Sequence, residues 1–266
     1  MSITKIVCIF FLAGIVLSCE KVIDIPLNEA DQRIVVEAVL KDSPGDNYIL
    51  LSKTGGVYTE NNFEKISGAV VRVTDISGAE FLFSEDTVIP GKYSNASLEI
   101  LPNNSYTLMI DINGTSLTST CKTFYKPTLD SLAYIEQIGT FGFGTDTTYL
   151  VFYNFVDNAT QENFYRVVPF INGKKQSATY VIDDELFNGQ TYTAPIFAST
   201  VNKGDTVIIE LTSFDKANYS YFSTLANASA GANAPTPANP VSNINGNAIG
   251  YFGAYTTDTL SIILPL

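Results

Sequence analysis

Short runs of apolar, β-branched and aromatic residues recur along the first half of the chain, separated by turn residues. Such runs suit a pleated, half-buried surface and predict β-strands. The runs are Arg33–Lys41, Asn47–Lys53, Ala69–Asp75, Ala79–Ser84, Gly91–Ser94, Ser105–Ile112 and Thr115–Phe124. Many short strands with regularly spaced turns are typical of a β-sandwich, so we expect one here.

Turn residues between these runs predict how the strands connect. Asn113-Gly114 is the strongest short hairpin signal, and Gly78 can adopt the positive φ that a second tight turn needs. Pro127 then interrupts the strand pattern. We therefore expect an N-terminal β-sandwich domain over residues 33–126 and a second β-rich domain over residues 127–266.

The second half continues the strand pattern. Its expected strands are Ser131–Gln137, Thr147–Val156, Phe164–Ile171, Thr179–Ile182, Ile196–Val201, Asp205–Phe214 and a terminal strand in the last apolar run. Residues 215–229 depart from it, because apolar side chains from Ala217 to Ala228 recur at helical spacing, with Ser213 or Asp215 available as N-cap. A long irregular segment rich in Pro and Asn follows, with Pro235, Pro237 and Pro240.

These patterns predict an all-β fold with two β-sandwich-like domains. The second domain carries one short amphipathic helix and the long Pro/Asn-rich loop. The residue pattern shows no convincing internal repeat, so the two halves share a class of structure and not a sequence motif.

The N-terminus has the features of a lipoprotein signal. Lys5 precedes an apolar run from Ile6 to Leu17, which is too short to span a bilayer comfortably. The run ends in Val16-Leu17-Ser18-Cys19, the order of a bacterial lipobox. We expect residues 1–18 to be a signal peptide, Cys19 to be lipidated and residues 19–32 to form a tether. The alternative is an ordinary secretory signal with a chance cysteine.

Lipidation would attach the protein to a membrane without a spanning helix. Each buried methylene contributes about 0.8 kcal/mol, so two or three acyl chains give stable attachment. We therefore expect a protein that is tethered to a membrane by its lipid and does not cross it.

Composition excludes several classes of function. The formal net charge is -12, which disfavours nucleic acid because that binding depends on Lys and Arg at phosphates. The chain has no His, which removes the usual Ser-His-Asp and Cys-His systems and most transition-metal sites. Cys121 is alone once Cys8 and Cys19 are assigned to the signal, so no disulfide framework is expected. We expect no catalytic residues, no cofactor and no bound metal.

A few clusters are candidates for binding or modification. Asp183-Asp184-Glu185 lacks the spacing of a calcium loop and is better interpreted as a solvated turn. Phe141 and Phe143 lie among glycines in an expected loop, where they would either contact a sugar or partner or fold back on the sheet. Asp precedes a hydroxyl residue at five candidate O-glycosylation sites, for which the alternative is a strand start; they are Thr87, Ser131, Thr147, Thr206 and Thr259.

The head and tail of the mature chain resemble a lipoprotein family of Bacteroidota known as domain of unknown function DUF4249. The resemblance is carried by "SCEKVIDIPLNEADQRIVVEAVL", by "SGAVV" at Ser67–Val71 and by "NPVSNINGNAIGYFGAY" near the C-terminus. The family's members commonly have Trp in the C-terminal helical segment, and this chain has none. The resemblance makes Gly250, Tyr251, Phe252 and Gly253 a candidate family-specific surface, with a packed corner as the alternative.

The resemblance implies a lipoprotein that is lipid-anchored in the outer membrane and displayed on the cell surface. It implies an accessory or binding subunit beside a TonB-dependent receptor, with a β-barrel protein as partner. The alternative is an autonomous adhesin or a module that binds a glycan or peptide. A hydrolase that uses carboxylates is a third hypothesis, and the family carries over no catalytic residues to support it.

Overall fold

The computed structural model describes residues 31–43, 47–55, 63–140, 143–177, 179–197, 200–229 and 239–266. The predicted signal peptide, Cys19 and most of the predicted tether lie outside these residues. Within them the chain is all-β with one helix, as the sequence predicts. No helix in this part of the chain has the length and apolar character needed to cross a membrane.

Seven strands of the first half lie where the sequence predicts them, within about two residues at each end. They are β1 (Ile34–Lys41), β2 (Tyr48–Lys53), β3 (Val70–Asp75), β4 (Glu80–Glu85), β5 (Lys92–Ser94), β6 (Ser105–Ile112) and β7 (Thr115–Lys122). Asn113 and Gly114 both have positive φ, 47° and 80°, which forms the predicted hairpin between β6 and β7.

The described residues of the second half form eight strands and the helix. They are β8 (Leu129–Thr140), β9 (Phe143–Val156), β10 (Phe164–Ile171), β11 (Lys174–Lys175), β12 (Tyr180–Asp183), β13 (Thr191–Pro195), β14 (Thr206–Phe214), α2 (Lys216–Ser229) and β15 (Ala248–Ile263). The predicted strand at Ile196–Val201 is wrong: the strand here is β13. Ile196 and Val201 are buried, so their apolar character reflects the core and not a regular strand.

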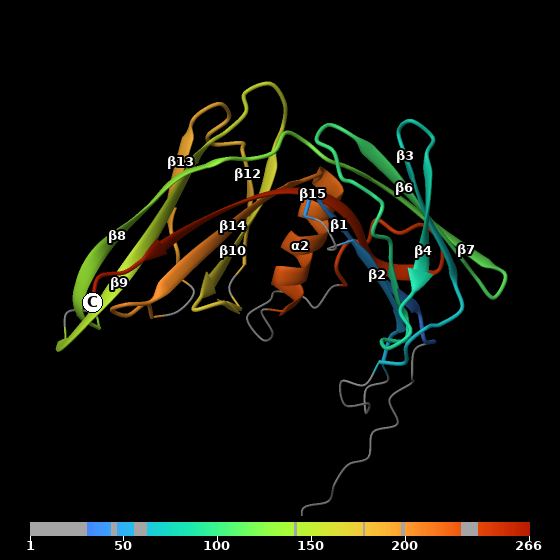
Figure 1. Cartoon of the computed structure of the whole chain (residues 1–266), viewed down its shortest axis with the longest axis horizontal. Helices are drawn as coiled ribbons and strands as arrows, with labels where there is room; N and C mark the ends of the chain where they lie inside the picture. The colour runs from blue at the N-terminus through green and yellow to red at the C-terminus, as the bar shows by residue number, and fades with distance from the viewer. Residues whose placement is uncertain are drawn as a thin grey trace, which may run out of the picture.

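Two sheets make up the fold. A 12-stranded sheet runs β11-β10-β14-β15-β1-β2-β5-β4-β3-β6-β7, with β12 also paired to β10, and a 3-stranded sheet runs β13-β9-β8. Figure 1 shows two β-lobes that splay apart like an arch, with β15 crossing between them and α2 beneath the crossing. β15 pairs in parallel with β1 and antiparallel with β14, so it joins the two lobes.

Each lobe has its own apolar core. The first core contains Val36 and Leu40 of β1 with buried side chains of β2 to β7. The second lies between β9 and β14, around Phe155 and Ile209. β15 contributes Phe252 to the first core and packs Ile262 against the second. The division at residues 126 and 127 stays a prediction, and the structure adds that this last strand serves both lobes.

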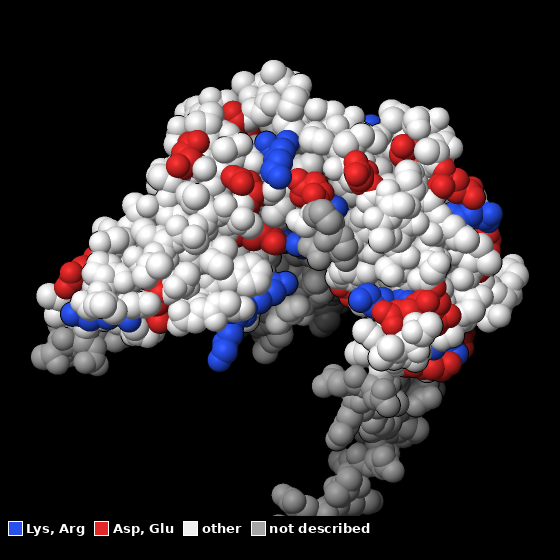
Figure 2. All heavy atoms as spheres, viewed as in Figure 1, with Lys and Arg blue, Asp and Glu red and all other residues white. Residues whose placement is uncertain are grey.

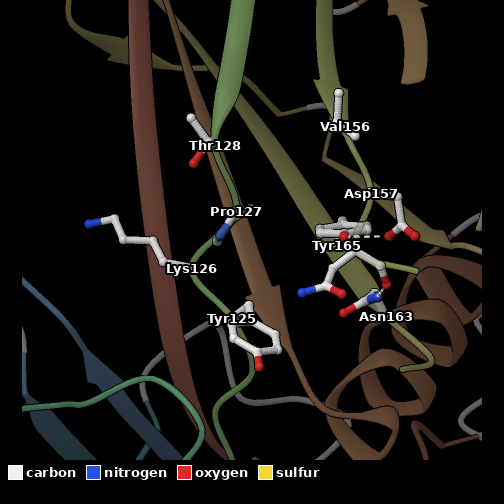
Figure 3. Close-up of a pocket in the computed structure, with 9 residues that line it drawn as sticks. Tyr125, Lys126, Pro127, Thr128, Val156, Asp157, Asn163 and Tyr165 are labelled. Atoms are coloured by element: carbon white, nitrogen blue, oxygen red, sulfur yellow. Dashed lines mark hydrogen bonds between the residues drawn. The ribbon is translucent and has the colours of Figure 1, made fainter. Parts of the chain in front are cut away.

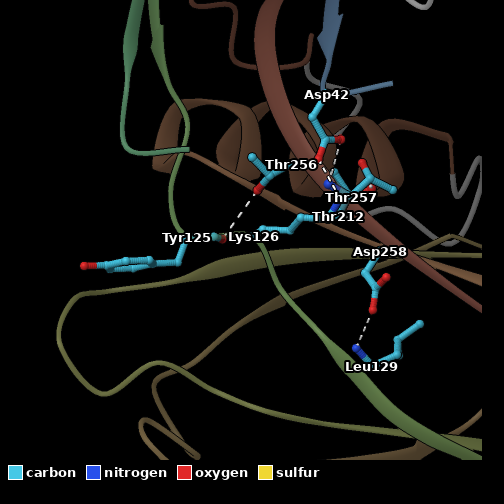
Figure 4. Close-up of polar contacts among 8 residues, drawn as sticks. All are labelled: Asp42, Tyr125, Lys126, Leu129, Thr212, Thr256, Thr257 and Asp258. Atoms are coloured by element: carbon cyan, nitrogen blue, oxygen red, sulfur yellow. Dashed lines mark hydrogen bonds and ion pairs between the residues drawn. The ribbon is translucent and has the colours of Figure 1, made fainter. Parts of the chain in front are cut away.

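Polar contacts hold residues 125–129, where the chain passes from one lobe to the other (Figure 4). We call these residues the crossing segment. Asp42 accepts a hydrogen bond from the Thr257 amide at 3.1 Å and pairs with Lys126 at 3.0 Å. Asp258 accepts a hydrogen bond from the Leu129 amide at 2.8 Å. β15 and the end of β1 therefore fix the crossing segment on both sides.

Candidate binding site

The site begins with the alternation of side chains along β1. Val36 and Leu40 point into the first core, so Glu37 and Lys41 lie on the opposite face of the sheet. The same alternation on β10 sends Tyr165 into the second core and Arg166 to that opposite face. We call this the concave face; it is the side of the 12-stranded sheet on which α2 lies, and Figure 2 shows a hollow beneath the arch.

Helix α2 is held against the sheet by aromatic packing of Tyr219, Tyr221 and Phe222 and by polar contacts at its N-terminal end. Asp215 is the N-cap, because its Oδ1 accepts a hydrogen bond from the Asn218 amide at 2.9 Å. Asn218 is fully buried and donates from Nδ2 to the Phe252 carbonyl at 3.0 Å. The Tyr255 hydroxyl donates to Asn218 Oδ1 at 3.2 Å. The predicted helix is confirmed, and of the two candidate N-caps, Ser213 and Asp215, the structure has Asp215.

Beside α2 the concave face contains a pocket of about 300 Å³, which we call the arginine pocket. It is lined by Glu37, Val39, Lys41, Tyr48, Arg166, Phe170, Lys175, Glu210, Phe222 and Tyr251. These residues come from β1, β2, β10, β11, β14, β15 and α2. Long-range strand pairing therefore assembles the pocket from both halves of the chain.

Both carboxylates of the arginine pocket already have partners. Glu37 accepts hydrogen bonds from the hydroxyls of Tyr48 at 3.2 Å and Tyr251 at 3.4 Å. Burial raises the pKa of Tyr251 above its usual value, so its hydroxyl stays a donor at neutral pH. Glu210 forms an ion pair with Lys41 at 3.1 Å, and both side chains are less than a fifth exposed.

Arg166 differs from its neighbours, because its buried Nε has no hydrogen-bond partner among the described residues. Its guanidinium carbon lies 4.8 Å from the ring centroid of Phe222 and 5.1 Å from that of Tyr255. Its Nε is buried and makes no hydrogen bond. Among the described residues, no carboxylate forms an ion pair with it. The two rings provide cation–π contacts for the guanidinium, which forms no ion pair with a described carboxylate.

A second hollow continues from the arginine pocket along the same face. It has a volume of about 360 Å³ and includes Val35, Leu50 and Phe63. Glu37 lines both hollows. The concave face thus offers a charged pocket next to a more apolar one.

A third pocket, of about 320 Å³, lies on the other side of β10 beside the crossing segment (Figure 3). Its buried polar groups have protein partners: the Tyr165 hydroxyl donates to Asp157 at 2.5 Å, and the Gly189 amide donates to the other oxygen at 2.8 Å. Burial, with Asp157 next, raises the pKa of Tyr165. Asn163 donates to the Asn158 carbonyl at 2.8 Å. We call this the crossing pocket, and its contacts are those of a structural joint.

The acidic cluster at Asp183-Asp184-Glu185 sends its side chains to separate partners. Asp183 accepts a hydrogen bond from the Tyr219 hydroxyl at 2.7 Å, and buried Asp184 accepts one from the Asn163 amide at 2.9 Å. Glu185 is exposed. The described residues contain no group of three or more acidic, Cys or His side chains arranged to hold a metal ion.

The candidate surface at residues 250–253 is divided by the structure. Phe252 is fully buried in the first core. Gly250 and Gly253 pack so closely that an added Cβ would collide with the backbone of Val36 and with the side chain of Tyr255, respectively. Tyr251 lines the arginine pocket. Three of the four positions are therefore packed inside the fold, and a binding role for the segment stays a prediction that only Tyr251 is placed to support.

The other candidate residues are scattered. Phe141 lies outside the described residues, and Phe143 begins β9 with its side chain undescribed. The candidate glycosylation residues Thr87, Ser131 and Thr259 are exposed, whereas Thr147 and Thr206 are half-buried. Cys121 is a buried free thiol in the first core.

The sequence analysis did not identify Arg166, Glu37 and Lys175, three of the charged residues that line the arginine pocket. In "FYRVVPFI" the arginine reads as an ordinary outward position of a strand. The one signal that could have found it is charge: Arg166 is a cation within an otherwise apolar run of a strongly acidic chain.

Comparison with known proteins gives a family and weak structural similarities. A sequence profile of the family described as Domain of unknown function (DUF4249) matches residues 20–261. No curated protein matches. Among solved structures, the chicken interferon gamma receptor alpha chain is 9% identical with a TM-score of 0.26, over 88% of this chain and 98% of the receptor chain. A DUF4785 family protein from Legionella pneumophila is 10% identical with a TM-score of 0.23, over 68% and 52%.

Proposed function

Because the chain belongs to the DUF4249 family, we propose that it is a lipid-anchored outer-membrane protein that binds a partner or its cargo through the concave face. In this proposal it is an accessory subunit of a TonB-dependent receptor-type system, and the partner is an outer-membrane β-barrel protein. The observation that carries the binding role is the arginine pocket, where Arg166 contacts two aromatic rings and forms no ion pair with a described carboxylate.

The position of the N-terminal end of the fold supports an orientation in which the concave face is turned toward the membrane. β1 begins at the foot of the first lobe, on the side toward which the arch opens (Figure 1). A tether from Cys19 to Arg33 spans at most about 50 Å when fully extended. A chain anchored through Cys19 would therefore keep its concave face near the membrane and any barrel embedded in it.

A second candidate function is an autonomous surface protein that binds a glycan. The observation that favours it is the mixed lining of the arginine pocket, where the aromatic ring of Phe170 lies with the charged side chains of Arg166 and Glu37. Ligand binding on that face would then need no barrel. The two functions differ in whether a barrel is present in the native complex.

The test is a pull-down of the C-terminally tagged, lipidated protein from native membranes in mild detergent, with mass spectrometry of the captured proteins. Cys19→Ala is the matched control, because it removes the lipid site and leaves the folded part unchanged. We expect an outer-membrane β-barrel in equal amount with the native chain, and its loss with the control. Capture of the lipoprotein alone, accessible to protease on intact cells, would contradict the accessory role and favour the autonomous one.

A further inference from the structure

The arginine pocket has the opposite sign of charge from the rest of the protein. Three cations line it, Lys41, Arg166 and Lys175, against the two carboxylates Glu37 and Glu210, so its formal charge is 3 − 2 = +1. The whole chain has a formal charge of -12. A cationic pocket in an acidic chain attracts an anionic group, and the surrounding negative surface repels anions that do not fit it.

The ion pairs leave Arg166 and Lys175 as the cations that can meet a ligand. Lys41 is paired with Glu210. Lys175 is exposed on β11, and it has no ion pair with any described residue. The rings of Phe222 and Tyr255 hold the Arg166 guanidinium, so its order does not depend on the ligand. A fixed guanidinium binds a carboxylate with two parallel hydrogen bonds at low entropic cost.

We infer that the arginine pocket binds an acidic sugar through its carboxylate. The proposal deepens the function above and rests on its assignment of the concave face as the binding surface. The carboxylate would pair with Arg166, and Lys175 would add a second positive charge. The volume of about 300 Å³ lies at the lower end of the range for small-molecule pockets and suits a single ring.

The rest of the lining favours a sugar over an apolar peptide end. Glu37 and Glu210 keep acceptor lone pairs beyond those used by Tyr48, Tyr251 and Lys41, and the Arg166 guanidinium and the Lys175 ammonium present donors. Sugar hydroxyls can use both kinds of group. Phe170 adds an aromatic ring to the same wall, which suits the apolar face of a sugar ring.

The test uses purified full-length protein in mild detergent and isothermal titration with three probes. They are a galacturonic acid trimer, the neutral galactose trimer and an acidic tripeptide with a free carboxyl end. We expect saturable binding of the uronate trimer that weakens at high salt, with both other probes at least about tenfold weaker because a charge-assisted hydrogen bond is lost or misplaced. Equal binding of the neutral trimer, tighter binding of the tripeptide, or no uronate binding would overturn the proposal.

Variants locate the binding on the concave face. Arg166→Gln should weaken uronate binding about tenfold or more, and Lys175→Gln roughly threefold, since it removes an exposed charge. Lys174→Gln is the matched control: it lies next to Lys175 on β11 but does not line the pocket, and it should bind as the native chain does. If Arg166→Gln does not fold, the affinities of Lys175→Gln and Lys174→Gln for the uronate trimer are compared instead. Equal affinities for that pair, or an unchanged Arg166→Gln, would contradict the assignment.

This result is separable from the accessory role. The titration needs no barrel, so uronate binding without a captured barrel would leave the sugar site standing and overturn only the proposed partner. A captured barrel without uronate binding would overturn only the sugar site.

Discussion

Tyr165 and Arg166 are consecutive residues of β10, yet they have opposite surroundings. The Tyr165 side chain enters the crossing pocket, where its hydroxyl donates to Asp157 at 2.5 Å. The Arg166 side chain enters the arginine pocket, where its buried Nε has no partner. The Tyr165 hydroxyl is therefore hydrogen-bonded within the protein, whereas the Arg166 Nε has no hydrogen-bond partner among the described residues.

The comparison of Tyr165 with Arg166 distinguishes polar groups that stabilise the fold from polar groups that we propose bind a ligand. Buried polar atoms are normally hydrogen-bonded, because an unpaired one costs free energy. The crossing pocket follows this rule, as expected of a joint between two lobes. An unpaired atom that a fold retains at a concave surface indicates a group that a ligand can satisfy.

The largest expected effect comes from breaking the strand pair that holds both faces together. Gly250→Ala would place a Cβ against the Val36 carbonyl at φ 117°, so β1 and β15 must separate. We expect a loss of about 3 kcal/mol or more in the free energy of unfolding, or no folded protein. Urea unfolding followed by circular dichroism measures it, since the chain has no Trp.

Gly78→Ala is the control for Gly250→Ala. It has a positive φ of 87° but nothing within 4 Å of the added Cβ, so only backbone strain of about 1 kcal/mol is expected. Equal losses for the two variants would show that close packing of β15 on β1 is not what the glycine serves.

A smaller effect is expected from releasing the helix that borders the arginine pocket. Asp215→Ala removes the N-cap and also the acceptor for the Lys122 amide at 3.0 Å. We expect a loss of about 2 kcal/mol in the free energy of unfolding. The exposed Asp130→Ala is the control and should change it by less than about 0.5 kcal/mol. Similar values for both would contradict the capping role.

The direct comparison of the two faces uses neighbouring positions. Tyr165→Phe leaves Asp157 without one buried donor and should cost about 1.5 kcal/mol in the free energy of unfolding. Arg166→Gln breaks no ion pair among the described residues and loses contacts with two aromatic rings, so it should cost less than about 1 kcal/mol. Urea unfolding of both variants measures the order. A larger loss for Arg166→Gln would make the arginine a structural residue and remove the contrast.

The smallest effect concerns a paired carboxylate in the first lobe. Hydrogen bonds from the Gly91 amide, Ser67 and the Gly68 amide lower the pKa of Glu85 from 4.5 to about 2. Its contribution to stability is therefore complete above pH 4.5 and is lost as the pH falls to about 2. Glu85→Gln should lower the urea midpoint at pH 7 and have less effect at pH 2.5. The exposed Glu80→Gln is the control; a pH-independent effect of Glu85→Gln would contradict the assignment.

Local pattern predicted the strands well and the site poorly. β6 and β10 match their predicted bounds, because alternation and the hairpin residues Asn113 and Gly114 are local signals. The pairing of β1 with β15 joins positions more than 200 residues apart, so no local pattern reports it. Since this pairing brings Glu37 beside Tyr251, the arginine pocket could not be assembled from the sequence.

The glycine-containing segment at residues 250–253 shows that a sequence motif can be noticed and its role still be misjudged. We predicted a binding surface here because the segment carries the family resemblance. In the structure, Gly250 and Gly253 allow close packing. Small residues in a strand report a near approach of other atoms, and the sequence does not say whether those atoms belong to a ligand or to the same chain.

The central claim is that a partner or its cargo binds the concave face, and site-specific photo-crosslinking in native membranes tests it most directly. A photoreactive residue in place of Leu50 would lie on the concave face, and one in place of Leu82 would lie at an exposed position of β4. We predict a covalent adduct with an outer-membrane β-barrel protein from position 50 and none from position 82. An adduct from position 82 with none from position 50 would contradict the claim.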